Sequence, residues 1–307
     1  MALSDSPTSG CNSTESSVSL LQQASYTLPT IPAYFLIGPL AVVHGIYAKH
    51  FGLSLATIAT VLLACRLFDA VSDPAIGYCS DRYHAHSGSR KPFVMAGGLL
   101  LVISSYFLFV PSEGTTVSTS YFLVCLLAFY FALTLFEIPQ LSWGAELMAG
   151  SRGKTTIYAL RSLGVNIGLL LFYLVPLLPF FNSSAYTPQT LHWVVLAAGL
   201  LMLPSLWLCN RFTPNGRQTF TVTNHNTNQA YTSLWSLLQE IINNKPLLAF
   251  LAAFFSFGVG VGMWFSLQFI FIDVYLGLGE YFALVNMIGL CVGSVLIGFW
   301  VKLANRI

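Results

Sequence analysis

Eight stretches of the chain are each long and apolar enough to cross a lipid bilayer as an α-helix, which takes about 20 mostly apolar residues. Charged residues make up only 8% of the 307 residues, and the mean hydropathy is +0.71. A soluble domain carries about 25% charge. Uniformly apolar runs of this length lack the alternation of a membrane β-barrel, so the predicted fold class is an all-α, multi-pass membrane protein. The stretches lie at 29–48, 53–79, 93–111, 118–142, 156–181, 191–209, 246–272 and 281–303.

Several soluble function classes find no support in the sequence. The net charge is +2 and the basic residues form no single patch, so we expect no nucleic-acid partner. The six cysteines include no Cys-x-x-Cys pair and are interpreted as small apolar residues. No nucleophile–base pair, His/Glu metal motif or phosphate-binding loop occurs. We therefore expect no enzyme activity, and no cofactor or metal other than a coupling ion, Na⁺ or H⁺.

Basic residues are distributed unevenly about the apolar stretches. In the predicted topology ten Lys and Arg residues lie on one side of the membrane, and of the Lys and Arg in loops only Lys49 lies on the other. The positive-inside rule assigns the first, basic side to the cytoplasm, together with the N-terminus. This predicts a multi-pass protein of the plasma membrane, or of the inner membrane in a bacterium. The basic side carries Arg82, Arg90, Lys91, Arg152, Lys154, Arg211, Arg217, Lys245, Lys302 and Arg306.

The order of the stretches predicts four regions. Residues 1–28 are rich in Ser and Thr and contain no Lys or Arg, which indicates a disordered cytoplasmic tail. Residues 29–209 hold six apolar stretches and form a six-helix transmembrane bundle. Residues 210–245 are polar and serve as a cytoplasmic linker. Residues 246–307 hold two more helices, interpreted as a second bundle that is truncated.

Charged residues inside the second apolar stretch mark a candidate site, because a charge at the bilayer centre costs at least about 2.5–3.5 kcal/mol. Spacings of three and four residues place Arg66, Asp69 and Asp73 on one helical face. Two neighbouring carboxylates repel each other in a low dielectric. Arg66 offsets part of the repulsion, and a bound Na⁺ or a proton would offset the rest. Ser72 adds an oxygen ligand nearby, and an all-oxygen site suits a hard cation.

Other intramembrane polar residues extend this site. Thr134 and Glu137 share one face of the fourth stretch, and Arg161 lies in the fifth. If the second, fourth and fifth stretches meet, one buried site is negatively charged until a cation enters. Trp264 and Gln268, one turn apart in the seventh stretch, are candidate solute contacts, as is Arg66. The alternative is a set of ion pairs that only fixes helix packing.

The motifs that contain these residues resemble those of a known protein family. The run from Arg66 to Pro74, followed by Gly77, Asp81-Arg82 and Gly88-Ser89-Arg90-Lys91-Pro92, is similar to the second helix and following loop of the glycoside–pentoside–hexuronide:cation symporters, which belong to the major facilitator superfamily. The segment Thr134-x-x-Glu137-Ile138-Pro139 and the later Arg161 match the same family. The likeness covers residues 30–306.

The resemblance implies a fold of two six-helix bundles that transports by alternating access. This chain would then hold the complete N-terminal half and two helices of the C-terminal half. The family's cation site maps onto Asp69, Asp73, Glu137 and Thr134, with Ser72 where a sugar permease has Asn. Its sugar-contacting arginine maps onto Arg161, which with Glu137 gives the solute side. Ala33 stands where the sugar permease has a sugar-binding Asp. The gating loop maps onto Gly77, Asp81, Arg82, Arg90 and Lys91.

Two functions from different classes follow from these observations. The first is a cation-coupled secondary transporter, a monomer in the bilayer, that carries a small polar solute such as a sugar or glycoside together with Na⁺ or H⁺. The second is a membrane protein that does not transport, either a receptor-like or scaffold helix bundle or a truncated product. Four missing helices favour the second function for the chain as it stands.

Overall fold

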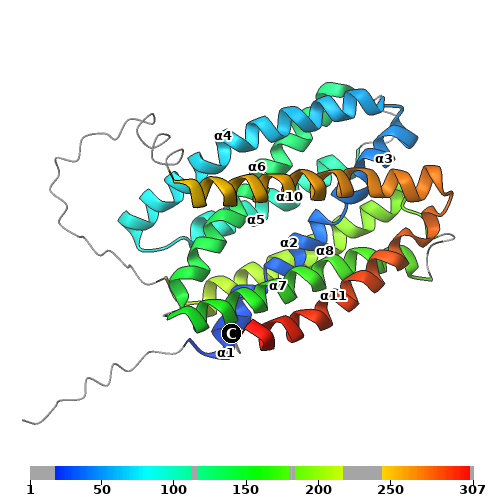
Figure 1. The fold of residues 1–307 in the computed structure, drawn as a ribbon. Coiled ribbons are helices and arrows are strands. Elements are labelled where there is room, and N and C mark those ends of the chain that lie inside the picture. Colours follow the sequence, from blue (N-terminus) through cyan, green and yellow to red (C-terminus); the bar gives the residue numbers. More distant parts are fainter. Residues whose placement is uncertain are drawn as a thin grey trace, which may run out of the picture.

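The computed structural model describes residues 18–111, 117–148, 150–179, 181, 184–216 and 244–304. In these residues every regular element is a helix, and eight helical segments are long and apolar enough to cross a membrane. The all-α prediction is thereby confirmed. Seven long helices follow the first segment (Figure 1): α4 (Leu55–Ser87), α5 (Lys91–Phe109), α6 (Thr119–Leu147), α7 (Gly150–Leu174), α8 (Pro188–Phe212), α10 (Lys245–Ile270) and α11 (Phe282–Ala304).

The first segment is broken into three short helices, α1 (Leu20–Thr27), α2 (Thr30–Ile37) and α3 (Leu40–Phe51). Pro29 and Pro39 stand at the two breaks, because proline lacks the N–H that an α-helix interior needs. At the end of the bundle where α3 terminates, short non-α turns extend two other helices. The turn η1 (Val175–Leu177) follows α7, and the π-helical η2 (Phe271–Tyr275) follows α10. A further turn, η3 (Gly279–Tyr281), leads into α11.

The predicted tail boundary at residue 28 is wrong. Ser19 caps α1, and the first membrane-spanning segment begins at Leu20. Tyr26 is fully buried and its hydroxyl donates to the Gln140 carbonyl oxygen of α6 over 2.8 Å. Local composition could not reveal this contact, since it joins residues far apart in the chain. The remainder of the predicted tail, residues 1–17, lies outside the described residues.

The predicted linker also begins later than expected. Helix α8 continues past residue 209 to Phe212, and Thr213 is buried behind it. Residues 217–243 of the predicted linker lie outside the described residues. The segment 213–216 packs back on the bundle, because the indole Nε1 of Trp143 donates to the Pro214 carbonyl oxygen over 3.1 Å.

Glycines allow the helices to approach closely inside the bundle. A side chain at Gly97 of α5 would collide with the α6 backbone at Phe136. A side chain at Gly168 of α7 would collide with the carbonyl oxygen of Ile31 in α2. Small residues serve this purpose in membranes, because helices there associate through close packing and not through the hydrophobic effect.

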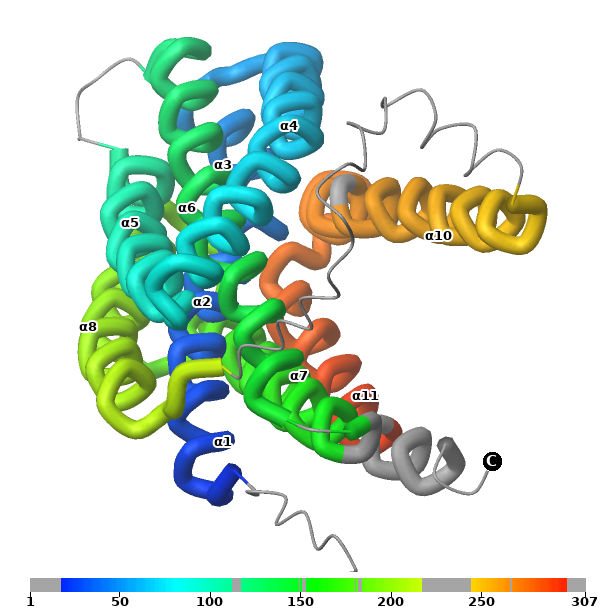
Figure 2. The backbone as a smooth tube through the Cα atoms, turned by 90° about the vertical axis from the view of Figure 1, so that its left-hand side faces the viewer, coloured from blue at the N-terminus to red at the C-terminus, as the bar shows by residue number. Residues whose placement is uncertain are grey.

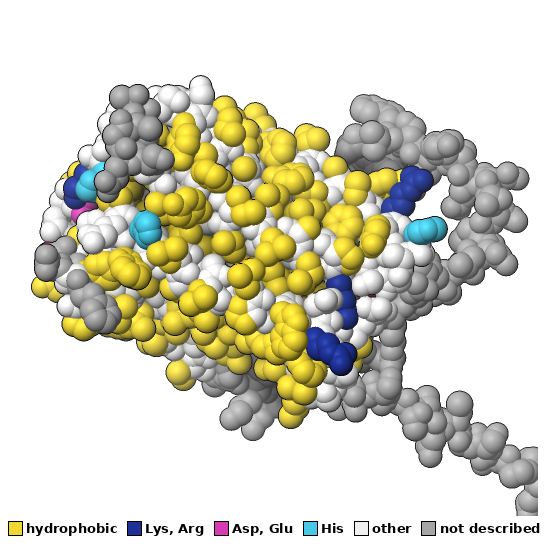
Figure 3. All heavy atoms as spheres, turned by 180° about the vertical axis from the view of Figure 1, so that it is seen from behind, with side chains coloured by type: hydrophobic (Ala, Val, Ile, Leu, Met, Phe, Trp, Pro, Cys, Tyr) yellow, Lys and Arg dark blue, Asp and Glu magenta, His cyan; other side chains and the backbone are white. Residues whose placement is uncertain are grey.

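The outer surface of the bundle is apolar between two polar ends. Figure 3 shows hydrophobic side chains over one face, with most of the Lys and Arg side chains toward its ends. We call the end that carries Arg82, Arg90, Lys91, Arg211 and Lys245 the basic end. At the opposite end, Lys49 pairs with Asp273 over 3.6 Å. These residues therefore lie at the two ends of the bundle to which the sequence assigns them.

Helix α10 leans away from the rest of the bundle. Figure 2 shows it standing clear of α4 and α7, farthest from the bundle where it begins, at the basic end. A Cβ added at Gly258, Gly260 or Gly262 would meet nothing within 4 Å. Its far end touches α3, where Phe269 fills the space beside Gly45. Helix α11 packs along α7, and Asn166 donates to the Ser294 hydroxyl over 3.0 Å.

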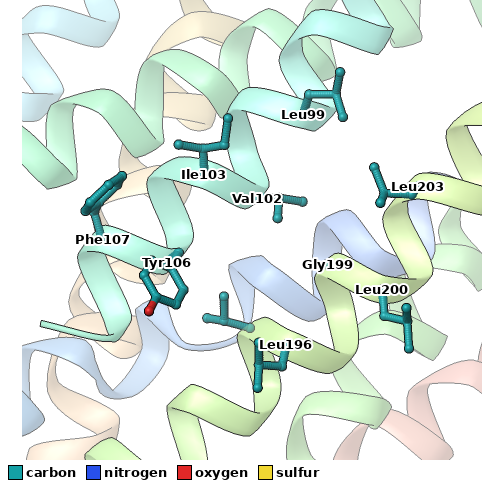
Figure 4. A pocket seen from close by; sticks show the side chains of 10 residues that line it. Leu99, Val102, Ile103, Tyr106, Phe107, Leu196, Gly199, Leu200 and Leu203 are labelled. Atoms are coloured by element: carbon teal, nitrogen blue, oxygen red, sulfur yellow. The ribbon is translucent and has the colours of Figure 1, made fainter. Parts of the chain in front are cut away.

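A groove of about 540 Å³ opens between α5 and α8 (Figure 4). Gly199 leaves it room, and its lining is almost wholly aliphatic and aromatic, with the Tyr106 hydroxyl as an exception. No charged side chain lines it, so a polar solute has few partners there. The groove is lined by Leu99, Val102, Ile103, Tyr106, Phe107, Val195, Leu196, Gly199, Leu200 and Leu203.

Candidate functional site

Helices α4 and α6 meet at a polar contact near the middle of both. The Thr134 hydroxyl of α6 donates to Asp73 Oδ1 of α4 over 2.9 Å. Both side chains are partly buried. The predicted meeting of the second and fourth apolar stretches at these two residues is therefore present in the structure.

One turn away on α4, Arg66 pairs with Asp69. Arg66 Nη1 lies 3.1 Å from Asp69 Oδ2, and Arg66 Nη2 donates to the Tyr130 hydroxyl of α6 over 3.1 Å. The guanidinium also stacks over the Tyr130 ring, 4.6 Å from its centroid. Tyr130 therefore contacts Arg66 through both its hydroxyl and its ring, and it helps to position the guanidinium beside Asp69.

Two oxygens in this region of α4 have no hydrogen-bond partner. They are Asp69 Oδ1 and Ser72 Oγ, and both are buried. A buried polar atom without a partner is costly, and most such atoms in proteins are satisfied by protein, water or an ion. Asp73 adds a carboxylate to the same stretch of α4, so three oxygen-bearing side chains lie within residues 69–73. Oxygen donors are the ligands that hard cations prefer.

A second polar group lies one helical turn along α6 from Thr134. Glu137 Oε1 accepts hydrogen bonds from Arg161 Nη2 of α7 over 2.7 Å and from the Tyr34 hydroxyl of α2 over 2.6 Å. The Arg161 guanidinium lies 5.8 Å from the centroid of the Tyr34 ring, and its Nε is buried without a partner. The sequence places Glu137 and Arg161 together on the solute side, and the two form an ion pair here. The resemblance also assigns Glu137 to the cation site, but its hydrogen bonds go to Arg161 and Tyr34.

A cavity of about 540 Å³ adjoins these groups. Tyr34, Arg66 and Tyr130 belong to its wall, so the cavity touches both polar groups. His44 contributes an imidazole. Helix α10 closes one side through Gly262 and Phe265. The remaining lining is Ile37, Gly38, Leu40, Ala41, Leu62, Leu63, Leu169 and Tyr173.

The two candidate solute residues of α10 do not line this cavity. Trp264 is 63% exposed and stands beside Phe265, which does line it. Gln268 Nε2 donates to Asn286 Oδ1 of α11 over 3.0 Å. The helical register explains the difference, because neighbouring residues on a helix point about 100° apart. On α10 the cavity is therefore lined by Gly262 and Phe265, not by Trp264.

The predicted gating loop forms a charge cluster at the basic end. Arg90, which is buried, lies 2.6 Å from Asp81 of α4 and donates twice to Glu146 Oε1 of α6, over 3.0 and 2.9 Å. Arg90 also donates to the Ser80 hydroxyl over 3.0 Å. Burial lowers the pKa of Arg90, but the hydrogen bonds to Glu146 and Asp81 outweigh this and raise the pKa above its ordinary value.

The other predicted loop residues have separate partners. Lys91 donates to the Asn210 carbonyl oxygen over 2.9 Å, which ties α5 to α8. Arg82 is exposed and donates to Tyr78 one turn earlier on its own helix. A Cβ at Gly77 would touch only Ile138 of α6, at 3.8 Å. These three residues therefore lie outside the buried cluster around Arg90.

Sequence reasoning missed several residues that complete these groups. Tyr34 and Tyr130 complete the two intramembrane groups, while His84 and Glu146 complete the cluster at the basic end. Their partners lie 56 to 103 residues away in sequence. A tyrosine or a single charge near a helix end gives no sign of a partner so distant, although Glu146 was visible as an acidic residue at the end of an apolar stretch.

The chain matches the model of a known protein family along almost its whole length. Residues 23–307 match the family model described as "MFS/sugar transport protein". The chain belongs to this family. The resemblance to the glycoside–pentoside–hexuronide:cation symporters is thereby confirmed, and the eight-helix bundle is part of a major facilitator fold.

Individual relatives of this family are named as transporters. The chain is 27% identical over 157 residues to the "Uncharacterized symporter YnaJ" of Bacillus subtilis (strain 168), covering 50% of this chain and 34% of that protein. It is 24% identical over 264 residues to the lactose permease of Lactobacillus delbrueckii subsp. bulgaricus, covering 81% and 41%. It is 23% identical over 259 residues to the raffinose carrier protein of Pediococcus pentosaceus, covering 81% and 40%. The chain thus spans less than half the length of these relatives.

Proposed function

We propose that this chain contains the cation site and the solute-facing polar pair of a cation-coupled symporter. The observation that carries the proposal is the set of oxygens on α4: Asp69 Oδ1 and Ser72 Oγ are buried without partners, and Asp73 is held by Thr134. A monovalent cation or a proton at this position would satisfy them. It would also reduce the repulsion between the two carboxylates.

The solute side of the proposal is the cavity beside Glu137 and Arg161. Tyr34 lines the cavity and donates to Glu137, so a solute in the cavity lies one side chain away from the ion pair. Arg66 lines the same cavity and pairs with Asp69, which links it to the cation side. Cation binding would favour the conformation that accepts solute only if the two states bind the ion with different affinity.

The solute class and the orientation are part of the proposal. Relatives named for lactose and raffinose support a sugar or glycoside as solute. The positive-inside rule supports placing the basic end in the cytoplasm. The family's two-bundle fold supports alternating access as the mode of transport.

The test uses the purified chain in proteoliposomes and two named probes, radiolabelled lactose and raffinose. Uptake is measured with an imposed Na⁺ gradient, an imposed pH gradient or neither. We expect one gradient to stimulate uptake, and Asp73→Asn to remove the stimulation. Glu280→Gln is the matched control, because Glu280 is an exposed carboxylate of the turn before α11.

A second readout does not depend on the choice of sugar. Replacing choline chloride by NaCl, or lowering the pH, should raise the melting temperature of the wild-type chain more than that of Asp73→Asn. If neither condition distinguishes the two proteins and no uptake occurs, the cation site is wrong and a non-transporting helix bundle is favoured. The wild-type and Asp73→Asn chains must elute alike in size-exclusion chromatography for the comparison to count.

A further inference from the structure

The charge cluster at the basic end also contains an ionisable side chain, His84, which lies beside Glu146. His84 lies on α4, one turn after Ser80, and its side chain is only 6% exposed. Its Nε2 atom lies 3.3 Å from Glu146 Oε2, and its Nδ1 atom is buried without a partner. Histidine is the side chain whose charge changes most readily between pH 5 and 8.

One carboxylate oxygen of Glu146 accepts hydrogen bonds, and the other has no hydrogen-bond donor. Arg90 occupies Oε1 with two hydrogen bonds. Oε2 is buried, accepts no hydrogen bond and faces the His84 imidazole. Gly216, in the segment after α8, lies directly over this oxygen, and a side chain there would collide with it. Glu146 Oε2 is therefore shielded from solvent and positioned for one further donor, which His84 can supply.

The charges of the cluster do not cancel while His84 is neutral. Asp81 and Glu146 carry two negative charges and Arg90 one positive charge, so the cluster is at −1 while His84 is neutral. An imidazolium brings it to zero. Of the other cations at this end, Lys91 is held by the Asn210 carbonyl oxygen and Arg82 is exposed and donates to the Tyr78 hydroxyl. Segment 213–216 contributes no ionisable side chain, since it reads Thr-Pro-Asn-Gly.

We propose that His84 is a pH-sensitive latch between α4 and α6. At acidic pH the imidazole takes a proton from solvent and donates a charge-assisted hydrogen bond from Nε2 to Glu146 Oε2, which ties the two helices at the basic end. At alkaline pH the proton leaves and the cluster returns to −1, so the tie weakens. Helix α4 also carries Asp69 and Asp73, and α6 carries Thr134. The latch therefore controls the helix pair that forms the candidate site, and it does not rest on the proposed transport.

The direct test follows each imidazole in the wild-type chain. Deuterium exchange at the histidine C2 position, read by mass spectrometry from pH 5 to 9, reports when each imidazole changes charge. We expect His84 to change charge within this range and to exchange several-fold more slowly than His86, which is exposed at the end of the same helix. A His84 that keeps one charge state across the whole range would overturn the proposal, whatever the variants do.

The second test compares melting temperatures at pH 8 and pH 5.5 for the full chain in detergent. Wild type and the control His86→Gln should gain about 2–4 °C more on acidification than His84→Gln, a shift typical of one lost charged interaction. Glu146→Gln removes the other partner and should lose the same increment. Equal gains in wild type and His84→Gln would contradict the latch. If His84→Gln does not fold, the exchange measurement on the wild type still decides.

Discussion

Thr134 and Asp73 join helices α6 and α4 through a hydrogen bond of 2.9 Å near the middle of the bundle. The bond engages one oxygen of Asp73, and on the same helix Ser72 Oγ and Asp69 Oδ1 are buried without hydrogen-bond partners. An ion that enters this region would therefore meet a carboxylate whose orientation is already set. Such preorganisation reduces the entropy that binding has to overcome.

Thr134→Val should destabilise the fold and weaken cation binding. It keeps the shape of the side chain and removes the donor, so a partly buried carboxylate loses its partner at a cost of about 1–3 kcal/mol. Thr134→Ser keeps the donor and should stay close to wild type. Thermal melting with and without NaCl measures both effects. Equal melting temperatures for the Val and Ser variants would show that the bond contributes nothing.

Arg161→Leu should be more damaging than Tyr34→Phe, although both residues donate to Glu137 Oε1. Removing the arginine leaves an uncompensated charge inside the bundle, which costs about 3–5 kcal/mol. Removing the tyrosine hydroxyl leaves the ion pair intact and costs about 1 kcal/mol. Adding Glu137→Gln to Arg161→Leu should recover most of the lost stability.

This difference is read from melting temperatures of purified, monodisperse variants. Tyr173→Phe is the matched control for Tyr34→Phe, because Tyr173 lines the same cavity. The ion-pair interpretation would be refuted if the double variant were less stable than Arg161→Leu alone.

Gly97→Ala should prevent correct packing of α5 on α6, while Gly260→Ala should be tolerated. The added methyl at 97 collides with the α6 backbone at Phe136, which cannot move aside as a side chain could. Overpacking of this kind costs about 1–3 kcal/mol or more. At Gly260 nothing lies within 4 Å, and alanine is the better helix former by up to about 1 kcal/mol. The yield of monodisperse protein and the melting temperature report both outcomes.

Cysteine labelling in intact cells tests the orientation. A membrane-impermeant maleimide should label Lys49→Cys from outside, and should label Arg82→Cys only after the membrane is opened. The background lacks Cys11, Cys79 and Cys291, so that native thiols do not contribute. Exposed Lys49 pairs with Asp273 at the far end of the bundle, and a surface ion pair contributes little to stability, so its replacement should leave the fold intact. The reverse labelling pattern would invert the proposed topology.

The apolar spans and the charges within them could be predicted because both depend on local sequence. A run of about 20 apolar residues is a helix in a bilayer whatever surrounds it, since its backbone must satisfy its own hydrogen bonds. The spacing of Arg66, Asp69 and Asp73 likewise fixes their common helical face. The resemblance places Asp73 and Thr134 in one cation site and Glu137 and Arg161 on the solute side, and the structure has a hydrogen bond within each of these two pairs.

The tertiary structure alone decided which partners complete each group. Tyr34 of α2 donates to Glu137 of α6, and Gly168 lets α2 lie close against α7, which carries Arg161. Phe265 lines the cavity and Trp264 does not, and at the far end of α10 Phe269 packs beside Gly45 of α3. His84 meets Glu146 only where α4 and α6 come together at the basic end. Local sequence fixes where a helix lies and which residues share its face, whereas the rotation and contacts of that helix depend on the packing of all its neighbours.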